Sequence, residues 1–440
     1  MGMIGWTSVR GGVGAAAAAA LLALPAVASG QGAPATVGVA SPNCGPVQYG
    51  GPGTPSGVIV SDLPMVGDSA QRSSQMVTAD LLALEQAGWR AGSVPVGFQA
   101  CNDASPTTGT WDADMCRANA QAYAATPTVL GVVGTYNSGC AAAMIPILNQ
   151  ASTPMVSPGN TLICLTEPAR GCGDGMPGSL YPTGVRSYVR VIPNDAYQGA
   201  GLASFASRLH VRRPFLLYAA HDATSTGQAR TYRGAARALG QRLAGVRAWN
   251  PQASDYRRLM RKVKRARPDA IVLAGLIDQN GARLIRDKVK VVGGNRHVPL
   301  LAFDGFAQQE TIRAAGRASR GMYASVPGVD PSQLPGRGAA FTRELATKVA
   351  PAPVELFAPY AGQATAVLLS ALEQAGGSRG AAAAALVSTQ VTDGVLGSFG
   401  FTARGDSTLG QVTVYRAAAT MRPARLVTPR ARVVRAARLG

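Results

Sequence analysis

The chain has 440 residues, 47% of them hydrophobic and 15% charged, which is enough for a large buried core and more than one domain. It carries a formal net charge of +19, and the excess of Arg is interpreted as a solvated basic surface, the alternative being affinity for anionic polymers. With only three His, most His-based metal sites and catalytic triads are disfavoured.

The first 28 residues are predicted to be a signal peptide. Arg10 precedes an apolar run over residues 13–27, and residues 26–28 (AVA) give the small-residue cleavage pattern. The alternative is a short anchor helix, although the run is short for a membrane span. The first Cys is Cys44, so no lipoprotein box follows the run. We expect an exported protein that is periplasmic or extracellular and associated with the cell envelope.

Six cysteines suit an exported protein, and none has the CxxC spacing of a zinc ribbon or a thioredoxin site. Cys164 and Cys172 bracket a polar loop that contains Pro and Gly, and we expect them to form a disulfide. We expect at least one further bridge among the cysteines around two consecutive loops, which are Cys101, Cys116 and Cys140. Cys44 would then be the odd partner.

Residues 29–56, rich in Gly and Pro, are predicted to be a linker or an ordered N-terminal arm. Apolar β-prone runs then alternate with helical patterns. The expected strands are residues 58–60, 94–98, 129–133, 155–157, 188–192, 215–218, 270–274 and 299–302, with β-prone pieces at 395–401 and 411–415. The expected helices are residues 74–86, 112–125, 139–150, 197–210, 227–239, 256–265, 280–288, 335–349 and 359–374. Short apolar runs separated by helices are typical of buried parallel strands, so the pattern predicts an α/β fold.

This pattern occurs twice and is followed by a return segment, which predicts two lobes and several crossings between them. Lobe I is expected over residues 57–192 plus 327–395, and lobe II over 193–326 plus 396–416. Residues 417–440 contain six Arg and no acidic residue, and we expect a flexible basic tail there.

The motifs of common enzymes are absent: the sequence has no GxxxxGK[ST], no HExxH and no GxSxG. We therefore expect a protein that is not an enzyme and uses no cofactor or metal. Polar loops follow the predicted strands at residues 61–72, 135–138, 158–161, 221–226 and 304–306. In an open α/β sheet such loops converge on one crevice, where ligands bind.

These loops predict a site for a zwitterion. Ser138 begins a predicted helix, whose N-terminal N–H groups favour an anion, and Gly159 and Thr161 offer close backbone approach and a second hydroxyl. Asp304 could bind a cation from the opposite wall. The alternative for Ser138 and Thr161 is ordinary helix N-capping.

Four stretches in chain order resemble a known family. Residues 59–67 (IVSDLPMVG), 130–139 (LGVVGTYNSG), 146–158 (PILNQ followed by PMVSP) and 188–193 (YVRVIP) are similar to the first strands, ligand loop and crossover of type I periplasmic-binding proteins. The closest branch is the leucine/isoleucine/valine-binding type of receptor for ABC transporters, and the resemblance spans roughly residues 57–416. It implies two lobes, each a parallel sheet flanked by helices, with multiple interlobe crossovers. It also implies a monomer that closes over a small solute, passes it to a membrane permease and has no nucleic-acid partner.

By this resemblance, Ser138, Gly159 and Thr161 match the positions that hold the α-carboxylate of an amino acid, and Asp304 matches the acidic residue for its α-ammonium.

The sequence departs from the family where aromatic residues often cover the ligand. Arg72, Thr226 and Leu276 fall near those positions. Their presence puts a branched-chain aliphatic ligand in doubt, and Arg72 could pair with an anionic or polar side group. Tyr360 could line the cleft from the later helical block.

Three other functions remain as alternatives. A ligand sensor of the same fold would bind an amide or a carboxylate without feeding a transporter. A secreted α/β hydrolase would need a nucleophile elbow, which the sequence lacks. A basic cell-surface adhesin would bind polyanions in a salt-sensitive manner.

Overall fold

The computed structural model describes residues 37–440. The predicted signal peptide over residues 1–28 and the beginning of the predicted arm lie outside the described residues. Within the described part, no helix is both long enough and apolar enough to cross a membrane.

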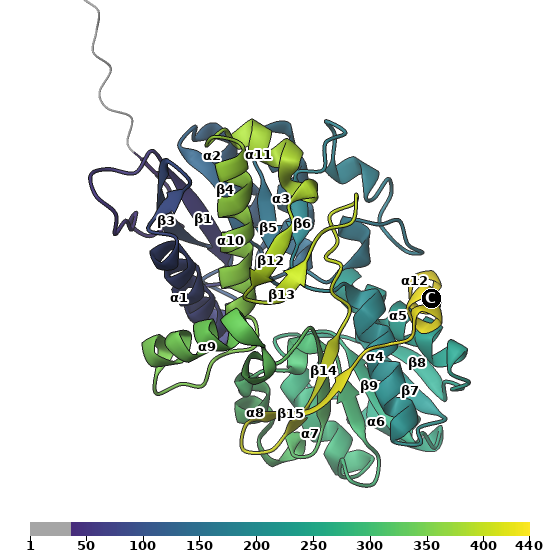
Figure 1. Cartoon of the computed structure of the whole chain (residues 1–440). Helices are drawn as coiled ribbons and strands as arrows, with labels where there is room; N and C mark the ends of the chain where they lie inside the picture. Colours follow the sequence, from purple (N-terminus) through teal and green to yellow (C-terminus); the bar gives the residue numbers. More distant parts are fainter. Residues whose placement is uncertain (1–36) are drawn as a thin grey trace, which may run out of the picture. The chain divides into compact units, whose positions relative to one another are not determined.

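The first sheet has six strands in the order β2-β3-β1-β4-β5-β6, all parallel except for the β2–β3 hairpin (Figure 1). Its strands are β1 (Gly57–Leu63), β2 (Arg90–Ala91), β3 (Val94–Asn102), β4 (Val129–Gly134), β5 (Met155–Ser157) and β6 (Tyr188–Arg190). The helices around it are α1 (Ala70–Gln86), α2 (Ala113–Ala125), α3 (Ser138–Gln150), α10 (Ala358–Gln374) and α11 (Arg379–Ala385). Alternate residues of β1 enter different cores: Ile59 joins the cluster with α1 and α10, whereas Val58 and Val60 join the cluster with α2 and α3. Helices therefore cover both faces, which explains the unbroken apolar run of this strand.

The second sheet has seven strands in the order β15-β14-β11-β10-β9-β7-β8. They are β7 (Pro214–Ala219), β8 (Gly245–Trp249), β9 (Ala270–Ala274), β10 (Leu300–Ala302), β11 (Tyr323–Pro327), β14 (Val412–Ala417) and β15 (Met421–Val427). The strands from β8 to β11 are parallel, and β14 and β15 add an antiparallel edge. Its helices are α4 (Asp195–Arg208), α5 (Ala223–Ala238), α6 (Arg257–Arg265), α7 (Gly281–Val291), α8 (Gln309–Ala315) and α12 (Ala431–Leu439).

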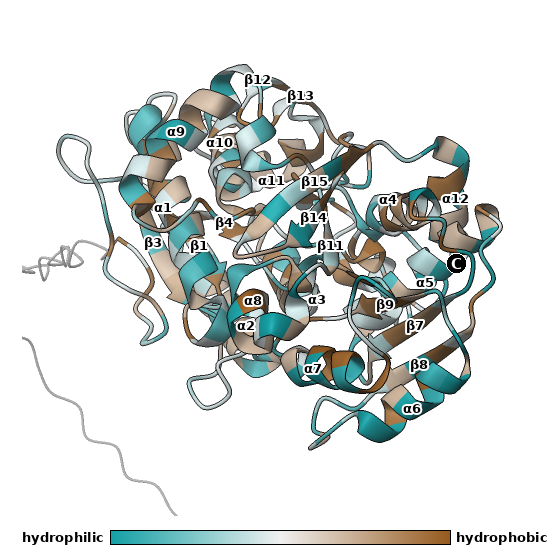
Figure 2. Cartoon of the chain, turned by 90° about the horizontal axis from the view of Figure 1, so that it is seen from below, coloured by the Kyte–Doolittle hydropathy of each residue, from teal (hydrophilic) through white to brown (hydrophobic). Residues whose placement is uncertain are grey.

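The basic helix α6 shows how charge and core are separated in this part of the chain. Met260 and Val263 are buried, while most of its Arg and Lys side chains face away from the sheet. In Figure 2 the ribbon of α6 is coloured mostly hydrophilic, whereas that of β7 is coloured mostly hydrophobic.

The chain passes between the two sheets three times: after β6, after β11 and after the hairpin of β12 (Val391–Gly394) and β13 (Gly397–Phe399). The second passage leads into α9 (Gly336–Val349) and α10, which contact α1 of the first sheet. The first and third passages are tied by a buried ion pair, in which Arg190 Nε lies 2.8 Å from Asp406 Oδ1. Asn194 Nδ2 also donates to Asp406 Oδ2 over 3.1 Å.

Residues 37–56 form an ordered arm, one of the two possibilities left open by their composition. Bridges from Cys44 to Cys101 and from Gln48 to Phe98 place it beside β3. The three disulfides are Cys44–Cys101, Cys116–Cys140 and the expected Cys164–Cys172. Cys116–Cys140 joins α2 to α3.

Residues 417–440 differ from the flexible tail expected from their charge. Residues 421–427 form the edge strand β15, and α12 packs against α5 and α4 (Figure 1). The helix buries Val433, Val434 and Ala437, whose spacing puts them on one helical face. Arg438 near its end forms an ion pair of 2.9 Å with Glu167. The Arg residues lie on the outer surfaces of ordered elements, so their number does not predict disorder here.

Candidate functional site

A small cavity lies where loops from the ends of both sheets meet. Its volume is about 30 Å³. From the first-sheet side it is lined by Trp111, Tyr136, Asn137, Ser138, Gly139, Gly159 and Thr161, which we call the first wall. From the second-sheet side it is lined by Asp222, Thr224, Gln228, Leu276 and Asp304, which we call the second wall. The predicted residues Ser138, Gly159, Thr161 and Asp304 are thus brought together.

Ser138 is the first residue of α3, and Asn137 rather than Ser138 occupies the N-cap position. The Ser138 Oγ atom accepts hydrogen bonds from the backbone N–H groups of Thr161 (3.1 Å) and Leu162 (3.2 Å). Because Oγ is an acceptor in both bonds, its own proton remains available to a ligand. Ser138 therefore links the N-terminus of α3 to the Thr161 loop, and a carboxylate would suit this combination of hydroxyl and helix N-terminus.

Two glycines of the first wall let aromatic rings pack directly on the backbone. A Cβ atom on Gly139 would lie 2.3 Å from Cη2 of Trp111. On Gly159, it would lie 2.9 Å from Cδ2 of Tyr136. Both rings belong to the cavity lining, so the absence of a side chain on each glycine sets the shape of the cavity.

The Thr161 loop is held from behind by buried polar side chains. Asn160 Nδ2 donates to the carbonyl of Tyr136 over 3.1 Å. Arg190 Nη1 donates to the carbonyls of Asn160 and Leu162, both over 2.9 Å. These bonds fix the carbonyl on each side of Thr161, so the first wall is a preorganised backbone surface.

Asp304 provides the charge of the second wall. It lies in the turn after β10 and is 6% exposed. Gln198 Nε2 (3.1 Å) and Gln228 Nε2 (3.0 Å) both donate to Oδ1, which leaves Oδ2 for another donor. Burial raises the pKa of Asp304, against the lowering effects of the Gln198 hydrogen bond and the Arg72 charge. A cation bound at Oδ2 would favour the ionised carboxylate.

Arg72 is 3% exposed and lies behind the lining on α1. Its Cζ atom is 4.4 Å from the ring centroid of Tyr136 and 5.7 Å from that of Phe357. It is therefore next to the cavity, separated from it by the Tyr136 ring.

Two other predicted site residues do not line the cavity. Thr226 lies on α5, where its hydroxyl donates to the carbonyl of Asp222 over 2.9 Å. The Tyr360 hydroxyl donates to the carbonyl of Val329 over 3.0 Å and accepts from its N–H over 2.7 Å, at the second passage between the sheets. Tyr360 thus supports the chain crossing and lies apart from the cavity.

Sequence reasoning missed several lining residues. Tyr136 lies within a polar loop that was predicted to reach the crevice, but its ring was not assigned a role. Trp111 precedes α2 at a bridge to Ala104 and has no recognisable motif, and Gln228 lies in the second turn of α5. Gln228 follows Thr224 of the predicted polar loop by four residues, a spacing that puts both on one helical face, and this was the one available signal.

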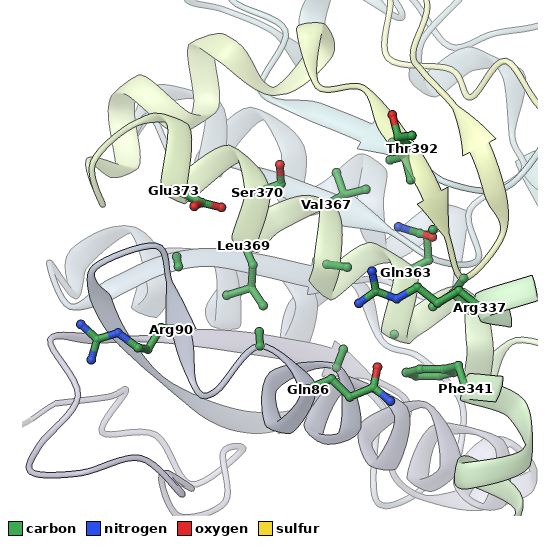
Figure 3. Close-up of a pocket in the computed structure, with 18 of the residues that line it drawn as sticks. Gln86, Arg90, Arg337, Phe341, Gln363, Val367, Leu369, Ser370, Glu373 and Thr392 are labelled. Atoms are coloured by element: carbon green, nitrogen blue, oxygen red, sulfur yellow. The ribbon is translucent and has the colours of Figure 1, made fainter.

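A larger cavity of about 520 Å³ lies elsewhere, between α1, α9, α10 and the β12 strand (Figure 3). Gln86 and Arg90 lie on one side of it, and Ser370 and Glu373 of α10 lie on the other. All of its lining comes from elements packed around the first sheet. A solute bound there would not bridge the two sheets, so we place the candidate site at the smaller cavity.

One group of possible metal ligands is found among residues 37–440: Asp103, Cys116 and Cys140. The two cysteines are joined in a disulfide and offer no thiolate. This group is therefore a structural cluster.

Comparisons with known proteins agree with this architecture. Leucine-binding protein LivK from Thermotoga maritima superimposes with a TM-score of 0.72 at 21% identity, over 84% of this chain and 99% of that protein. LivJ from Streptococcus pneumoniae, solved with isoleucine, gives 0.70 at 18% identity, over 84% and 99%. A solute-binding protein of an ABC transporter from R. palustris, solved with 4-hydroxybenzoate, gives 0.70 at 14% identity, over 84% and 97%. At these identities the likeness shows a shared fold.

No curated protein matches the chain. A family model described as periplasmic binding protein, however, matches residues 64–420, which is most of the sequence. This match and the two-sheet architecture establish that the chain belongs to the periplasmic binding protein family, with the type I fold.

Proposed function

We propose that this protein captures a small zwitterionic solute, an amino acid, outside the cytoplasm and delivers it to the permease of an ABC transporter. The observation that carries the proposal is the pairing of two unlike walls in one cavity. Ser138 and Thr161 offer hydroxyls beside the N-terminus of α3 on one side, and Asp304 offers a carboxylate on the other. A zwitterion has an anion and a cation at one carbon atom and matches both.

In this proposal the α-carboxylate binds at the N-terminus of α3. The Ser138 hydroxyl donates to it, and Thr161 provides a second hydroxyl. The α-ammonium donates to Asp304 Oδ2, because Oδ1 already accepts two amide hydrogen bonds. Each charge-assisted bond contributes about 1.5–3 kcal/mol.

Transport follows from closure of the lobes. The cavity is narrow and lies between the two walls, so we expect the walls to separate when the solute enters. The solute touches both walls only after closure, and this difference in contacts favours the closed state. The three passages between the sheets would form the hinge. Export by the predicted signal peptide over residues 1–28 and function as a monomer complete the proposal.

The test is a thermal-shift screen of the purified protein against amino acids, amides and small carboxylates, followed by calorimetry of each hit. A ligand that binds only the folded state raises the melting temperature. Hits confined to α-amino acids would support the proposal. Hits confined to amides or to carboxylates without an amino group would overturn the amino-acid assignment while keeping a solute-binding role.

A second candidate is a sensor of the same fold that binds an aromatic carboxylate. The rings of Trp111 and Tyr136 in the lining favour it, and Phe357 packs edge-on against Tyr136 at 5.2 Å. Such a ligand has no ammonium group. It would bind the Asp304→Asn variant at least as well as the original protein, whereas an amino acid would bind that variant more weakly.

A further inference from the structure

Arg72 is a buried cation without a polar partner. The side chain is 3% exposed, and its Nη2 atom is fully buried without a hydrogen-bond acceptor among residues 37–440. No ion pair is found for it within the same part of the chain, unlike the other fully buried guanidinium, Arg190, which contacts Asp406. Leaving a buried charged donor unsatisfied is costly, so this arrangement calls for a physical reason.

The surroundings of Arg72 compensate its charge only in part. The faces of Tyr136 and Phe357 attract the guanidinium but offer no strong acceptor. Three carboxyl groups on other segments, those of Asp278, Asp304 and Glu355, have pKa values that Arg72 lowers. Burial nevertheless keeps all three raised, that of Asp278 to about 6. They balance the charge of Arg72 at a distance and do not bind it.

Arg72 lies next to the cavity in which the solute is proposed to bind. Tyr136, on which it stacks, lines the cavity together with Ser138 and Asp304. In the proposed binding mode, Ser138 and Asp304 hold the two groups on the α-carbon. The guanidinium of Arg72 lies against the ring of Tyr136. A solute side chain that extends from the α-carbon past this ring would meet the guanidinium if the ring moves aside when the walls separate.

We propose that Arg72 binds an acidic group on the side chain of the solute, so that the substrates are acidic amino acids such as glutamate or aspartate. This inference rests on the proposed function. A planar guanidinium pairs with a carboxylate through two parallel hydrogen bonds and is suited to buried pairs. An aliphatic side chain would close the site around an unsatisfied cation, and a basic side chain would place two positive charges together.

The test compares L-glutamate, L-glutamine and L-leucine by calorimetry on the full-length protein and its Arg72→Met variant. Methionine keeps an unbranched apolar stem of similar width and removes the charge. We expect glutamate to bind the original protein at least tenfold more tightly than leucine, and to lose at least 30-fold in Arg72→Met while leucine loses less than threefold. Arg90→Met, a surface substitution in a different cavity, is the matched control and should change neither affinity.

The outcomes separate the inference from the proposed function. Leucine binding as tightly as glutamate, or an equal loss of both in Arg72→Met, would overturn the role of Arg72 and leave amino-acid binding intact. Failure of every α-amino acid, with carboxylates or amides binding instead, would overturn the proposed function itself. If Arg72→Met does not fold, Arg72→Lys serves in its place, because it keeps the charge and loses the fork. We expect Arg72→Lys to weaken glutamate binding at least fivefold relative to leucine binding. Equal changes in the affinities for the two ligands would contradict the inference.

Discussion

The two walls of the cavity are built on different principles. The first wall consists of a helix N-terminus, a hydroxyl and glycine backbone packed against rings, and Asn160 and Arg190 hold it in place. The second wall contains two carboxylates. Asp222 caps α5 by accepting from the N–H of Ser225, whereas Asp304, held by two glutamine side chains, keeps one oxygen for a ligand. The first wall would recognise a solute through fixed hydroxyl and backbone donors, whose charge state does not change. The second wall would recognise it through the buried carboxyl group of Asp304, whose ionisation depends on the group that binds to it.

This difference predicts how each wall fails. Loss of one donor from a preorganised backbone surface leaves the remaining donors in place. Loss of the Asp304 carboxylate removes the proposed partner of the ammonium, because Asp222 already caps α5. Substitutions in the second wall should therefore cost more than those in the first.

The largest effect is expected for Asp304→Ala. Truncating one partner of a buried charge pair costs about 2–5 kcal/mol, which is about 30- to 5,000-fold in affinity. Calorimetry with the best amino acid from the screen measures this loss. Asp114→Ala on α2 is the control, because its side chain is 88% exposed and lies outside the cavity. An affinity for Asp304→Ala close to that of the original protein would rule out the assignment of the second wall.

Ser138→Ala should have the next largest effect on binding. The variant loses a hydroxyl donor to the carboxylate and removes the acceptor for the N–H groups of Thr161 and Leu162. We expect a loss of about 1.5–3 kcal/mol, or roughly 10- to 150-fold in affinity. Ser370→Ala on α10, at the separate cavity of Figure 3, should leave the affinity unchanged. Equal affinities of the two serine variants would contradict the role of the first wall.

The buried carboxyl group of Asp195 should make the stability of the folded protein depend on pH. Burial, followed by repulsion from Asp304, raises the pKa of Asp195 from its usual value of 3.8 to about 8. Between these two values the unfolded chain has released the proton and the folded chain keeps it, so this group makes the protein less stable as pH rises from about 4 to about 8. The slope is at most about 1.4 kcal/mol per pH unit.

Asparagine does not titrate, so Asp195→Asn should lack this slope. Its free energy of unfolding in urea, relative to the original protein, should increase between pH 5 and pH 8. Other buried carboxyl groups are present in both proteins and largely cancel in the difference. A difference that stays constant across this range would show that Asp195 ionises normally in the folded protein.

The smallest effect is expected for Gly159→Ala. The new Cβ would lie 2.9 Å from the Tyr136 ring and 3.2 Å from its carbonyl oxygen, so the ring must move slightly. We expect a cost of about 1 kcal/mol, or roughly fivefold in affinity. Gly178→Ala is the matched control, because a Cβ there meets no atom within 4 Å. If both variants bind alike, the contact between the Gly159 backbone and the Tyr136 ring does not shape the cavity.

The central strands and the edge strands of the sheets differ in how well the sequence predicted them. Central strands such as β4 and β9 are buried on both faces and were predicted from their apolar runs. The edge strands β8 and β15 were missed, because they are partly exposed and carry one and two Arg. The inner strand β11, with the sequence YASVP, was missed as well although it is largely buried. Pro423 within β15 also argues against a strand, and an edge position is where Pro is tolerated. The sequence signal for a strand therefore depends on an uninterrupted apolar run, which burial on both faces favours and which the Ser and Pro of β11 interrupt.

The same limit applies to the site. Ser138, Gly159, Thr161 and Asp304 follow predicted strands and could be placed at the crevice by the rule for open α/β sheets. Thr226 and Tyr360 were also expected there, but their hydroxyls bond to nearby backbone instead. Loop order gives the neighbourhood of a residue, whereas the direction of its side chain depends on local packing.

The sequence alone determined the α/β class, the central strands and helices, the family and the polar loops that approach the cavity. These features depend on hydrophobic periodicity and local order along the chain. Only the tertiary structure decided which cysteines pair beyond Cys164–Cys172, that the basic C-terminal segment is ordered, and that Trp111, Tyr136 and Gln228 line the site. Each of these depends on contacts between residues far apart in the sequence, and such contacts leave no periodic trace in it.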